Sequence, residues 1–421
     1  MSKFLELSAK CFLGCGLVAA ISVSGAEAKG GDTVLHSFCT QQDCTDGSQP
    51  LGGVIADAAG NLYGTTQSGG ANQQGTVFRL APDGTYSLLY SFCAPANCTD
   101  GAGPSSQLIM DGSGNLYGTT MFGGANQGGT VFRLATDGTE TVLHSFCSVR
   151  HCRDGQWPQA GLIMDGAGNL YGTTGGGGIK NEGTVFTISA NGEETVLYSF
   201  RLAGNGAGPT TNLVMDGAGN LYGTTQSGSH GGPGIAFEVS SSGAFKQLYA
   251  FCSKANCADG SNPEAGLIMD GSGNLYGTTL NGGANGYGAV FKLATSGVET
   301  VLYSFCSKGD CSDGAYPAAS LIMDGSGNLY GTTQYGDGRD CSENNFNTLC
   351  GTVFRLATDG TETTLYSFCG KADCTDGSEP AGNLIMDGAG KLYGTTTFGG
   401  KGDCIGGCGT VFTLSSGGKK E

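Results

Sequence analysis

The sequence has little charge, and positive charge is the scarcer kind. Of its 421 residues, 20 are Lys or Arg and 36 are Asp or Glu, which gives a net charge of −16 at pH 7. Nucleic acids and anionic membrane surfaces are bound by clusters of Lys and Arg. The balance therefore argues against both as partners. Beyond the N-terminal segment there is no apolar run of membrane-spanning length, so no transmembrane helix is expected.

Recognisable catalytic motifs are also missing. The sequence contains no His-Glu-x-x-His, no Gly-x-Ser-x-Gly and no Walker-type phosphate loop, and it has only four His. It therefore predicts no catalytic residue, no metal ligand and no cofactor. His36 and His144 replace Tyr in a repeated strand, and packing is their expected role. An enzyme stays open as an alternative, because a site assembled from several repeats leaves no local motif.

The N-terminus has the pattern of a signal peptide. Lys3 and Lys10 precede an apolar run over residues 11–23, which is too short to span a bilayer, and Ala26-Glu27-Ala28 fits a signal peptidase site. We expect residues 1–28 to be removed. Residues 29–421 are then predicted to form a single exported domain in the periplasm or the medium, with no C-terminal anchor, acting as a monomer.

A repeated unit organises the rest of the chain. Asn-Leu-Tyr-Gly-Thr-Thr occurs six times, and a seventh copy has Lys in place of Asn. The spacing is 54 residues, except for one interval of 51 and one of 63. A fixed period near fifty indicates a propeller, a solenoid or an array. The copies begin at Asn61, Asn115, Asn169, Asn220, Asn274, Asn328 and Lys391.

Each unit contains four short stretches of strand-like composition. In the second unit these cover residues 108–110, 116–120, 130–134 and 141–146, rich in Val, Ile, Tyr, Phe and Thr. The first and third connections contain Asp-Gly, a strong signal for a tight hairpin, and the other two are long. The unit is therefore predicted to be a four-stranded antiparallel meander with tight hairpins at one end and long loops at the other.

Seven such units predict an all-β fold, a seven-bladed β-propeller. The exported chain begins with a lone fourth strand at 33–38 and ends with a first, second and third strand between 383 and 414. Pairing the N-terminal strand with the C-terminal blade would complete one blade and remove a free sheet edge. A stacked solenoid is the alternative, but it gains nothing from this offset.

At these residues the chain resembles the GloVer tandem-repeat proteins, a bacterial exported "choice-of-anchor" family. The likeness rests on the Asn-Leu-Tyr-Gly-Thr-Thr unit followed by Gly-Thr-Val-Phe, and it covers nearly all of the exported chain. The resemblance implies no catalytic residues. Members of the family carry C-terminal sorting tails, whereas only 415–421 follow the last strand here. This difference favours release over surface anchoring.

The cysteines predict local disulfides. Sixteen of the 18 Cys lie in the exported chain, and six of the seven loops between units carry Cys-x-x-x-x-Cys, while the seventh lacks both cysteines. Zinc is the alternative, but each loop supplies two ligands where four are usual. The short cross-links would stiffen the long-loop end, for ligand binding or for protease resistance. The predicted pairs are Cys39–Cys44, Cys93–Cys98, Cys147–Cys152, Cys252–Cys257, Cys306–Cys311, Cys341–Cys350, Cys369–Cys374 and Cys404–Cys408.

Two repeated Asp positions have a structural interpretation. One Asp ends the first strand of every unit, and a second follows the second Cys of each loop, with Asn205 in the unit that lacks Cys. Seven carboxylates facing a central channel would require a cation. The preferred interpretation is that each Asp caps its own turn by accepting backbone N–H groups. The first set is Asp57, Asp111, Asp165, Asp216, Asp270, Asp324 and Asp387.

Function is expected where the units differ. The residue before the Pro that recurs in each of these loops varies, and we call this position the slot; it holds Gln49, Gly103, Trp157, Gly208, Asn262, Tyr316 and Glu379. Trp and Tyr there would stack on a sugar or anchor a peptide, although Trp157 would equally pack on a neighbouring blade. Arg150 and His151 share its loop. The candidate ligand-binding residues are Trp157, Tyr316, His151, Arg150, Asn262 and Glu379.

Three functions follow from this sequence. The preferred one is an exported binding module for an extracellular ligand, a glycan or a peptide. The alternatives are a structural or envelope-associated protein without a small ligand, and a hydrolase or lyase with its site at the channel mouth. A long loop from Tyr335 to Cys350 is a lid, a binding finger or a neutral insertion.

Overall fold

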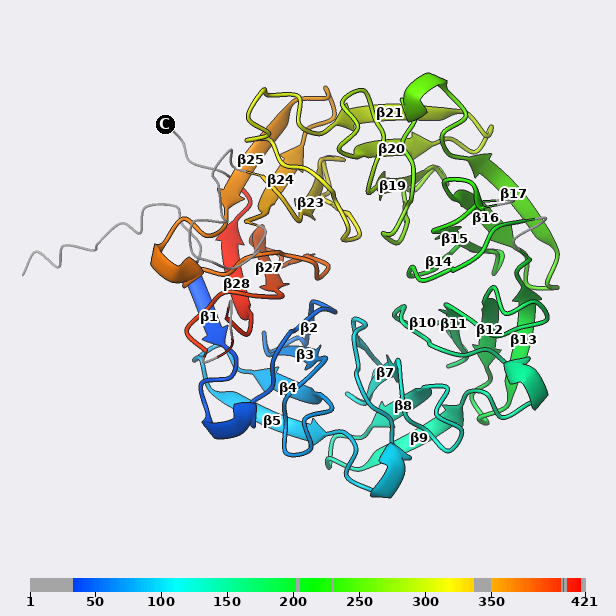
Figure 1. The fold of residues 1–421 in the computed structure, drawn as a ribbon, viewed down its shortest axis with the longest axis vertical. Helices are drawn as coiled ribbons and strands as arrows, with labels where there is room; N and C mark the ends of the chain where they lie inside the picture. The colour runs from blue at the N-terminus through cyan, green and yellow to red at the C-terminus, as the bar shows by residue number, and fades with distance from the viewer. Residues whose placement is uncertain are drawn as a thin grey trace, which may run out of the picture.

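Seven four-stranded antiparallel sheets are arranged as the blades of a β-propeller (Figure 1). The computed structural model describes residues 33–201, 205–228, 231–336, 350–402, 404 and 407–417. Blades 1 to 6 follow the chain as β2–β5, β6–β9, β10–β13, β14–β17, β18–β21 and β22–β25. Blade 7 has the order β26, β27, β28 and β1. The fold class expected from the repeat is confirmed.

The strands of each blade are lettered A to D from the centre outward. The A strands are β2 (Val54–Ala56), β6 (Ile109–Met110), β10 (Ile163–Met164), β14 (Val214–Met215), β18 (Ile268–Met269), β22 (Ile322–Met323) and β26 (Ile385–Met386). The B strands are β3 (Leu62–Thr66), β7 (Leu116–Thr120), β11 (Leu170–Thr174), β15 (Leu221–Thr225), β19 (Leu275–Thr279), β23 (Leu329–Thr333) and β27 (Lys391–Thr396).

The outer strands are equally regular. The C strands are β4 (Thr76–Leu80), β8 (Thr130–Leu134), β12 (Thr184–Ile188), β16 (Ile235–Val239), β20 (Ala289–Leu293), β24 (Thr352–Leu356) and β28 (Thr410–Ser415). The D strands are β5 (Tyr86–Ser91), β9 (Glu140–Ser145), β13 (Glu194–Ser199), β17 (Phe245–Ala250), β21 (Glu299–Ser304), β25 (Glu362–Ser367) and β1 (Thr33–Ser37). In the second unit the sequence predicted B and C correctly, whereas strand A is one residue shorter and strand D begins and ends one residue earlier.

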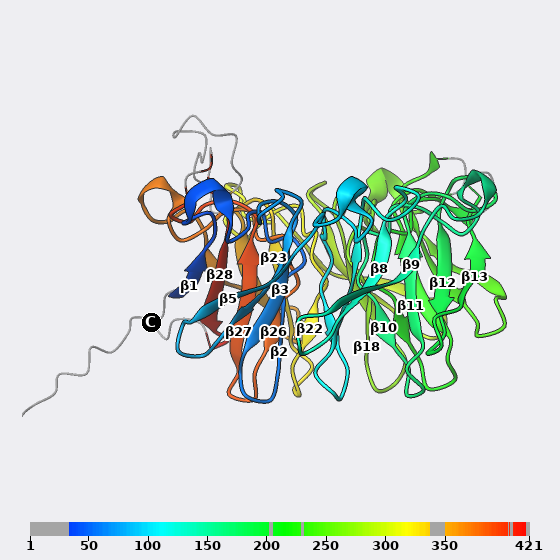
Figure 2. The same ribbon diagram turned by 90° about the horizontal axis from the view of Figure 1, so that it is seen from below.

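The connections separate into two faces (Figure 2). Tight A–B and C–D hairpins lie at one end of the ring. The B–C and D–A connections lie at the other end, which we call the long-loop face. Short 3-10 helices lie in the D–A connections on that face: η1 (Gln42–Cys44), η2 (Ala96–Cys98), η3 (Arg150–Cys152), η5 (Ala255–Cys257) and η7 (Ala372–Cys374).

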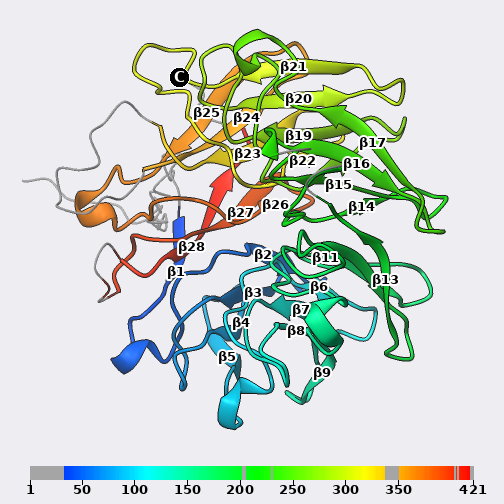
Figure 3. The same ribbon diagram turned by 45° about the vertical axis from the view of Figure 1, so that its right-hand side comes forward.

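The two ends of the domain close the ring. Strand β1 pairs antiparallel with β28, with Thr33 opposite Thr413 and Ser37 opposite Thr410, and the two strands lie side by side in Figures 1 and 3. Blade 7 is therefore built from both ends of the chain, as the offset of the repeat predicted. Closure leaves no blade without its outer strand.

One aromatic contact holds each pair of neighbouring blades together. A buried Phe after strand D packs edge-to-face on a buried Phe in strand C of the next blade, with ring centroids 4.9–5.1 Å apart at all seven junctions. The Gly of the repeat makes room for that ring. A Cβ on Gly118 would lie 2.8 Å from Cζ of Phe132. The Gly of the repeated motif is thus explained by the space that this Phe ring needs.

No helix within the described residues is long and apolar enough to cross a membrane. The predicted signal peptide, residues 1–28, lies outside the described residues, and so does most of the long loop between Tyr335 and Cys350.

Candidate functional site

The centre of the propeller is lined by the residues that follow the recurring loop Pro of each unit. These residues enclose a cavity of about 170 Å³, and their side chains are mainly hydroxyls, amides and methyl groups. Glu264 is the one titratable side chain among them, and its burial raises the pKa of its carboxyl group. The lining therefore suits neutral hydroxyl-bearing ligands better than it suits acid–base chemistry.

Amide side chains link different blades across this lining. Asn383 donates from Nδ2 to Oε1 of Gln107 at 3.2 Å, and Gln107 donates from Nε2 to the carbonyl of Val54 at 2.8 Å. The backbone N–H groups of Ser320 and Gly161 donate to the side-chain oxygens of Asn383 and Asn212. These bonds fix the positions of several amide side chains in the lining.

The slot has the same backbone geometry in every blade. All seven slot residues have φ between 54° and 65°, the left-handed region that favours Gly, yet five of them carry side chains. The slot N–H donates to a carbonyl of the preceding blade in each case, as from Trp157 to Gly128 at 2.8 Å. The slot is thus a strained position that joins two blades and presents a variable side chain.

Tyr316 lies at the centre of a tyrosine cluster. Its ring packs edge-on against Tyr287, at 5.6 Å between centroids, and against Tyr335, at 5.2 Å. Tyr287 comes from the B–C connection of blade 5 and Tyr335 from that of blade 6, and their exposed fractions are 39% and 43%. Burial, followed by the two neighbouring tyrosines, raises the pKa of Tyr316. Three aromatic rings are therefore fixed together on the long-loop face.

Trp157 occupies the slot between blades 2 and 3. Its exposed fraction is 39%, and one edge of its indole lies against Gly176 in the B–C connection of blade 3, where an added Cβ would come within 2.9 Å of Cε3. The indole ring is therefore partly packed against the protein and partly exposed to solvent. Phe122, in the B–C connection of blade 2, is also exposed. Among the described residues, no aromatic contact joins Trp157 to Tyr316, which lies three blades away.

The other slot candidates are less exposed. Asn262 is half-buried and donates from Nδ2 to the carbonyl of Gln226 at 3.4 Å. Glu379 is also half-buried, and its burial raises the pKa of its carboxyl group. Both keep the slot's backbone bond to the preceding blade. Their contribution to a ligand site remains a proposal.

Arg150 and His151 are exposed and lie in η3, within the Cys147–Cys152 loop. His151 has φ 62° at a position where four other loops carry Asn or Asp in the same conformation. The structural role of His151 is therefore to occupy this left-handed position of the turn. No described contact connects either residue with Trp157.

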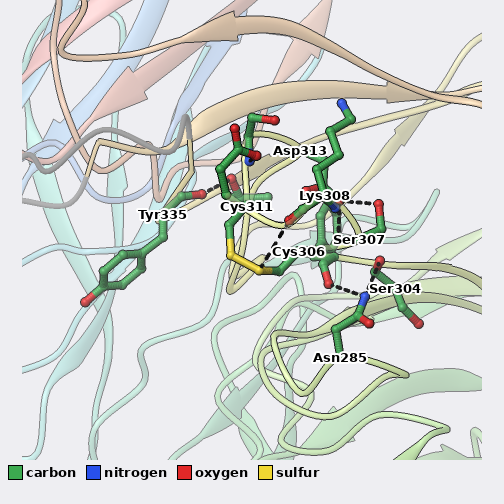
Figure 4. Close-up of a disulfide and its surroundings, with 12 residues drawn as sticks. Asn285, Ser304, Cys306, Ser307, Lys308, Cys311, Asp313 and Tyr335 are labelled. Atoms are coloured by element: carbon green, nitrogen blue, oxygen red, sulfur yellow. Dashed lines mark hydrogen bonds between the residues drawn. A yellow bond between two sulfur atoms is a disulfide. The ribbon is translucent and has the colours of Figure 1, made fainter.

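The structure contains the six predicted Cys-x-x-x-x-Cys disulfides and the Cys404–Cys408 bond. The predicted Cys341–Cys350 pair involves a residue outside the described ones. Figure 4 shows the Cys306–Cys311 loop, with Tyr335 beside it pointing away from the sulfurs. Sulfurs of Cys39, Cys44, Cys404 and Cys408 lie within 4.8 Å of one another. Because they form two disulfides, they are not available as thiolate ligands.

A buried Asp closes each of the six Cys-x-x-x-x-Cys loops. Asp313 is fully buried and accepts the N–H and Oγ–H of Ser307 at 2.8 and 2.7 Å, and the Tyr303 hydroxyl at 2.7 Å. Burial alone would raise its pKa, but these bonds outweigh burial and the pKa lies below its usual range. The turn role predicted for this Asp set is confirmed.

The Asp at the end of strand A has the same kind of role on the opposite face. Asp111 accepts the N–H groups of Ser113 and Asn115 at 2.9 Å, the Asn115 side-chain amide at 2.7 Å and the Tyr117 hydroxyl at 3.0 Å. All seven residues of this set accept such bonds within their own hairpins. The interpretation as turn caps is confirmed.

Outer strands carry a second set of carboxylates at the blade junctions. Glu299 and Glu362 pair with Lys254 and Lys308 from the preceding disulfide loop, at 2.7 and 3.5 Å. Glu140 occupies the same position of β9, but its loop has Pro95 where the others have Lys. Its Oε1 is buried without a partner, and burial followed by nearby Asp100 raises the pKa of Glu140 to about 7.

Comparisons with known proteins give a family-model match and similar solved structures. The model of the Gloeobacter/Verrucomicrobia repeat matches residues 14–218. One similar solved structure is a provisionally named gluconolactonase, with 11% identity over 93% of this chain and 94% of that one, at a TM-score of 0.43. Another is a luciferin-regenerating enzyme, with 14% identity over 91% and 95%, also at 0.43. No curated protein matches the chain.

The repeat matched by that family model continues through all seven blades, with Leu-Tyr-Gly-Thr-Thr forming strand B of each. Residues 14–218 therefore match the Gloeobacter/Verrucomicrobia repeat, and the chain as described fits a β-propeller built from that repeat, with seven blades.

Proposed function

We propose that this protein is an exported binding module whose long-loop face holds an extracellular glycan. The observation that carries the proposal is the presence of several exposed aromatic rings on that face. Phe122, Trp157, Tyr287 and Tyr335 are each 39–46% exposed, and all four lie in B–C or D–A connections. Exposed aromatic rings held rigidly are suited to stacking on sugar rings, because little side-chain entropy is lost on binding.

The surroundings of the rings favour a sugar over a charged ligand. The central cavity beside the slot is lined mainly by uncharged polar groups, including Ser105, Gln159, Thr210 and Ser320. Such groups exchange hydrogen bonds with water for hydrogen bonds with sugar hydroxyls. A peptide could be anchored by the same rings, and the array experiment described below distinguishes a peptide ligand from a glycan.

Export is part of the proposal. The disulfides in the D–A loops and the signal-like segment at residues 1–28 are typical of an oxidising compartment. Expression of the full chain with mass determination of the product tests this point. Removal of residues 1–28 and recovery outside the cytoplasm are expected; an uncut chain retained in the cytoplasm would contradict export.

The ligand is tested by glycan and peptide arrays probed with the full exported chain. Tyr335→Ala and Trp157→Ala are each expected to weaken binding about tenfold or more if that ring is in the interface. Leu88→Ala is the matched control, since Leu88 is 43% exposed but lies in β5 on the outer side of the ring. Binding that neither aromatic substitution reduces, or no binding above background, contradicts the proposal.

The hydrolase or lyase alternative requires a second acid or base near Glu264. The described cavity lining supplies Glu264 alone, so the observations favour the binding module. The structural alternative would be favoured by arrays that show no ligand.

A further inference from the structure

Blade 3 departs from the rule that governs the other D–A loops. Its loop is three residues shorter than the loop of blade 2, and it carries Arg201 where the others carry the first Cys of the disulfide. Asn205 stands where they have the buried Asp, and its Oδ1 accepts the N–H of Arg201 at 3.0 Å. The cap of the turn is kept, but a negative charge has been removed and a positive one has been added.

The same change removes the hydrogen-bond acceptor of a tyrosine hydroxyl. In blades 1, 4, 5 and 6 the Tyr of strand D donates its hydroxyl to the buried Asp, as Tyr90 does to Asp100 at 2.8 Å. Its equivalent in blade 3 is Tyr198, whose hydroxyl forms no hydrogen bond among the described residues. Arg201 lies close enough that its charge opposes the rise in the Tyr198 pKa caused by burial. A free O–H donor therefore lies beside a guanidinium.

A pocket of about 560 Å³ opens at this place on the outer side of blade 3. Its wall includes Tyr198 and Leu197 of β13, the exposed side chain of Ile179, and two arginines, Arg153 and Arg201. Neither guanidinium forms an ion pair within the described part of the chain. In a protein of net charge −16, two unpaired arginines at one pocket form an unusual local concentration of positive charge.

We propose that this pocket binds an oxyanion group of a ligand, a carboxylate, sulfate or phosphate, through Arg153, Arg201 and Tyr198. Guanidinium groups bind such oxygens through paired, charge-assisted N–H donors. The neutral Tyr198 hydroxyl adds one more hydrogen-bond donor. Ile179 and Leu197 provide apolar surface for the rest of the ligand. The site is separate from the aromatic rings of the long-loop face, and it does not depend on the function proposed for them.

Calorimetric titration of the full exported chain tests the site with four probes that share one sugar: glucuronate, glucose 6-sulfate, glucose 6-phosphate and glucose. We expect saturable binding of one or more of the three anions, weakened by added NaCl, and none of glucose. The anion bound most tightly identifies the group that the site prefers. Absence of saturable binding for all three anions overturns the proposal.

Substitutions locate the binding. Arg201→Gln and Arg153→Gln are each expected to raise the dissociation constant about tenfold, since each removes a charge-assisted bond. Tyr198→Phe is expected to raise it by a smaller factor. Arg150→Gln is the matched control, because Arg150 is an exposed arginine of the same disulfide loop that does not line the pocket. An equal loss with Arg150→Gln would show diffuse attraction and would also overturn the proposal.

Discussion

Lys254 and Glu299 form an ion pair across the junction of blades 4 and 5, with Nζ 2.7 Å from Oε2. The carboxylate side chain is 1% exposed, whereas that of the lysine is 51% exposed. Three of the six disulfide loops have Lys at this position, and the remaining three have Gln41, Pro95 and Val149. Where the lysine is missing and the Glu is kept, a buried carboxyl group has no cation beside it.

The first prediction concerns Glu140, which faces Asp100 and Tyr90 at the junction of blades 1 and 2. Its pKa is raised from 4.5 to about 7 by burial and then by Asp100. The folded state therefore holds a proton that the unfolded chain has lost, and stability falls as the pH rises from about 4.5 to 7. Glu140→Gln should flatten this fall and raise the free energy of unfolding at pH 8 by about 1–3 kcal/mol.

Urea unfolding at pH 4.5 and at pH 8 measures this effect. Glu299→Gln is the matched control, because it breaks the pair with Lys254 and should lower stability at pH 8. If Glu140→Gln destabilised the protein as much as Glu299→Gln does, Glu140 would not be an unpaired carboxyl group.

The second prediction supplies the missing cation to Glu194, the equivalent residue at the junction of blades 2 and 3. Burial and then Asp154 raise the pKa of Glu194 to about 7. Val149 precedes η3 with φ −98° and ψ 140°, close to the −100° and 157° of Lys254 before η5. Val149→Lys should therefore reach Glu194, lower its pKa and raise the free energy of unfolding at pH 8 by about 1 kcal/mol.

Thermal unfolding at pH 8 gives the measurement, and the double variant Val149→Lys/Glu194→Gln is the control. The lysine should have little effect once the carboxylate is gone. A similar gain in both backgrounds would mean that the lysine acts elsewhere.

The sequence predicted the parts of this fold that repeat. The strand pattern, the ring closure by residues 33–38, the Cys-x-x-x-x-Cys disulfides and the capping Asp residues all produce local signals that recur in several units. A signal that recurs in several units supports the same structural interpretation each time it occurs. The resemblance of the repeat also agrees with the family model that matches residues 14–218.

The parts missed are contacts between units. Tyr287 and Tyr335 lie 29 residues before and 19 after Tyr316, and nothing local joins them. The clue was positional, since both occur in the long B–C connections. Likewise, the replacement of a Cys by Arg201 was visible in the sequence, but its place beside Arg153 depends on how blade 3 packs against the preceding loop.

The third prediction concerns the disulfides. Cys93→Ala with Cys98→Ala should lower the free energy of unfolding by about 2 kcal/mol, the loop-closure entropy of so short a loop. The loop should keep its place, because Asp100 still accepts the Ala94 N–H at 3.1 Å and the Tyr90 hydroxyl at 2.8 Å.

Urea unfolding measures the loss, and circular dichroism verifies that the β-structure is kept. Asp100→Asn in the intact loop is the comparison, since Asn205 fills this role in the blade without a disulfide. Unfolding of the whole ring by the double Cys substitution would show that the loops hold the blades together and do more than stiffen one face.

The last prediction separates function from stability at the slot. Trp157 has φ 60°, where a side chain costs about 1 kcal/mol relative to Gly. Trp157→Gly should therefore be more stable than Trp157→Ala by about 0.5–1 kcal/mol, whereas both should lose the ligand contact of the indole ring. Two residues along, Gln159 is not in the left-handed region, so Gln159→Gly should be less stable than Gln159→Ala. Thermal unfolding of the four variants gives both differences. If the Ala variant were the more stable one at both positions, the slot would be unstrained, and its aromatic residues would then need no compensating role in binding.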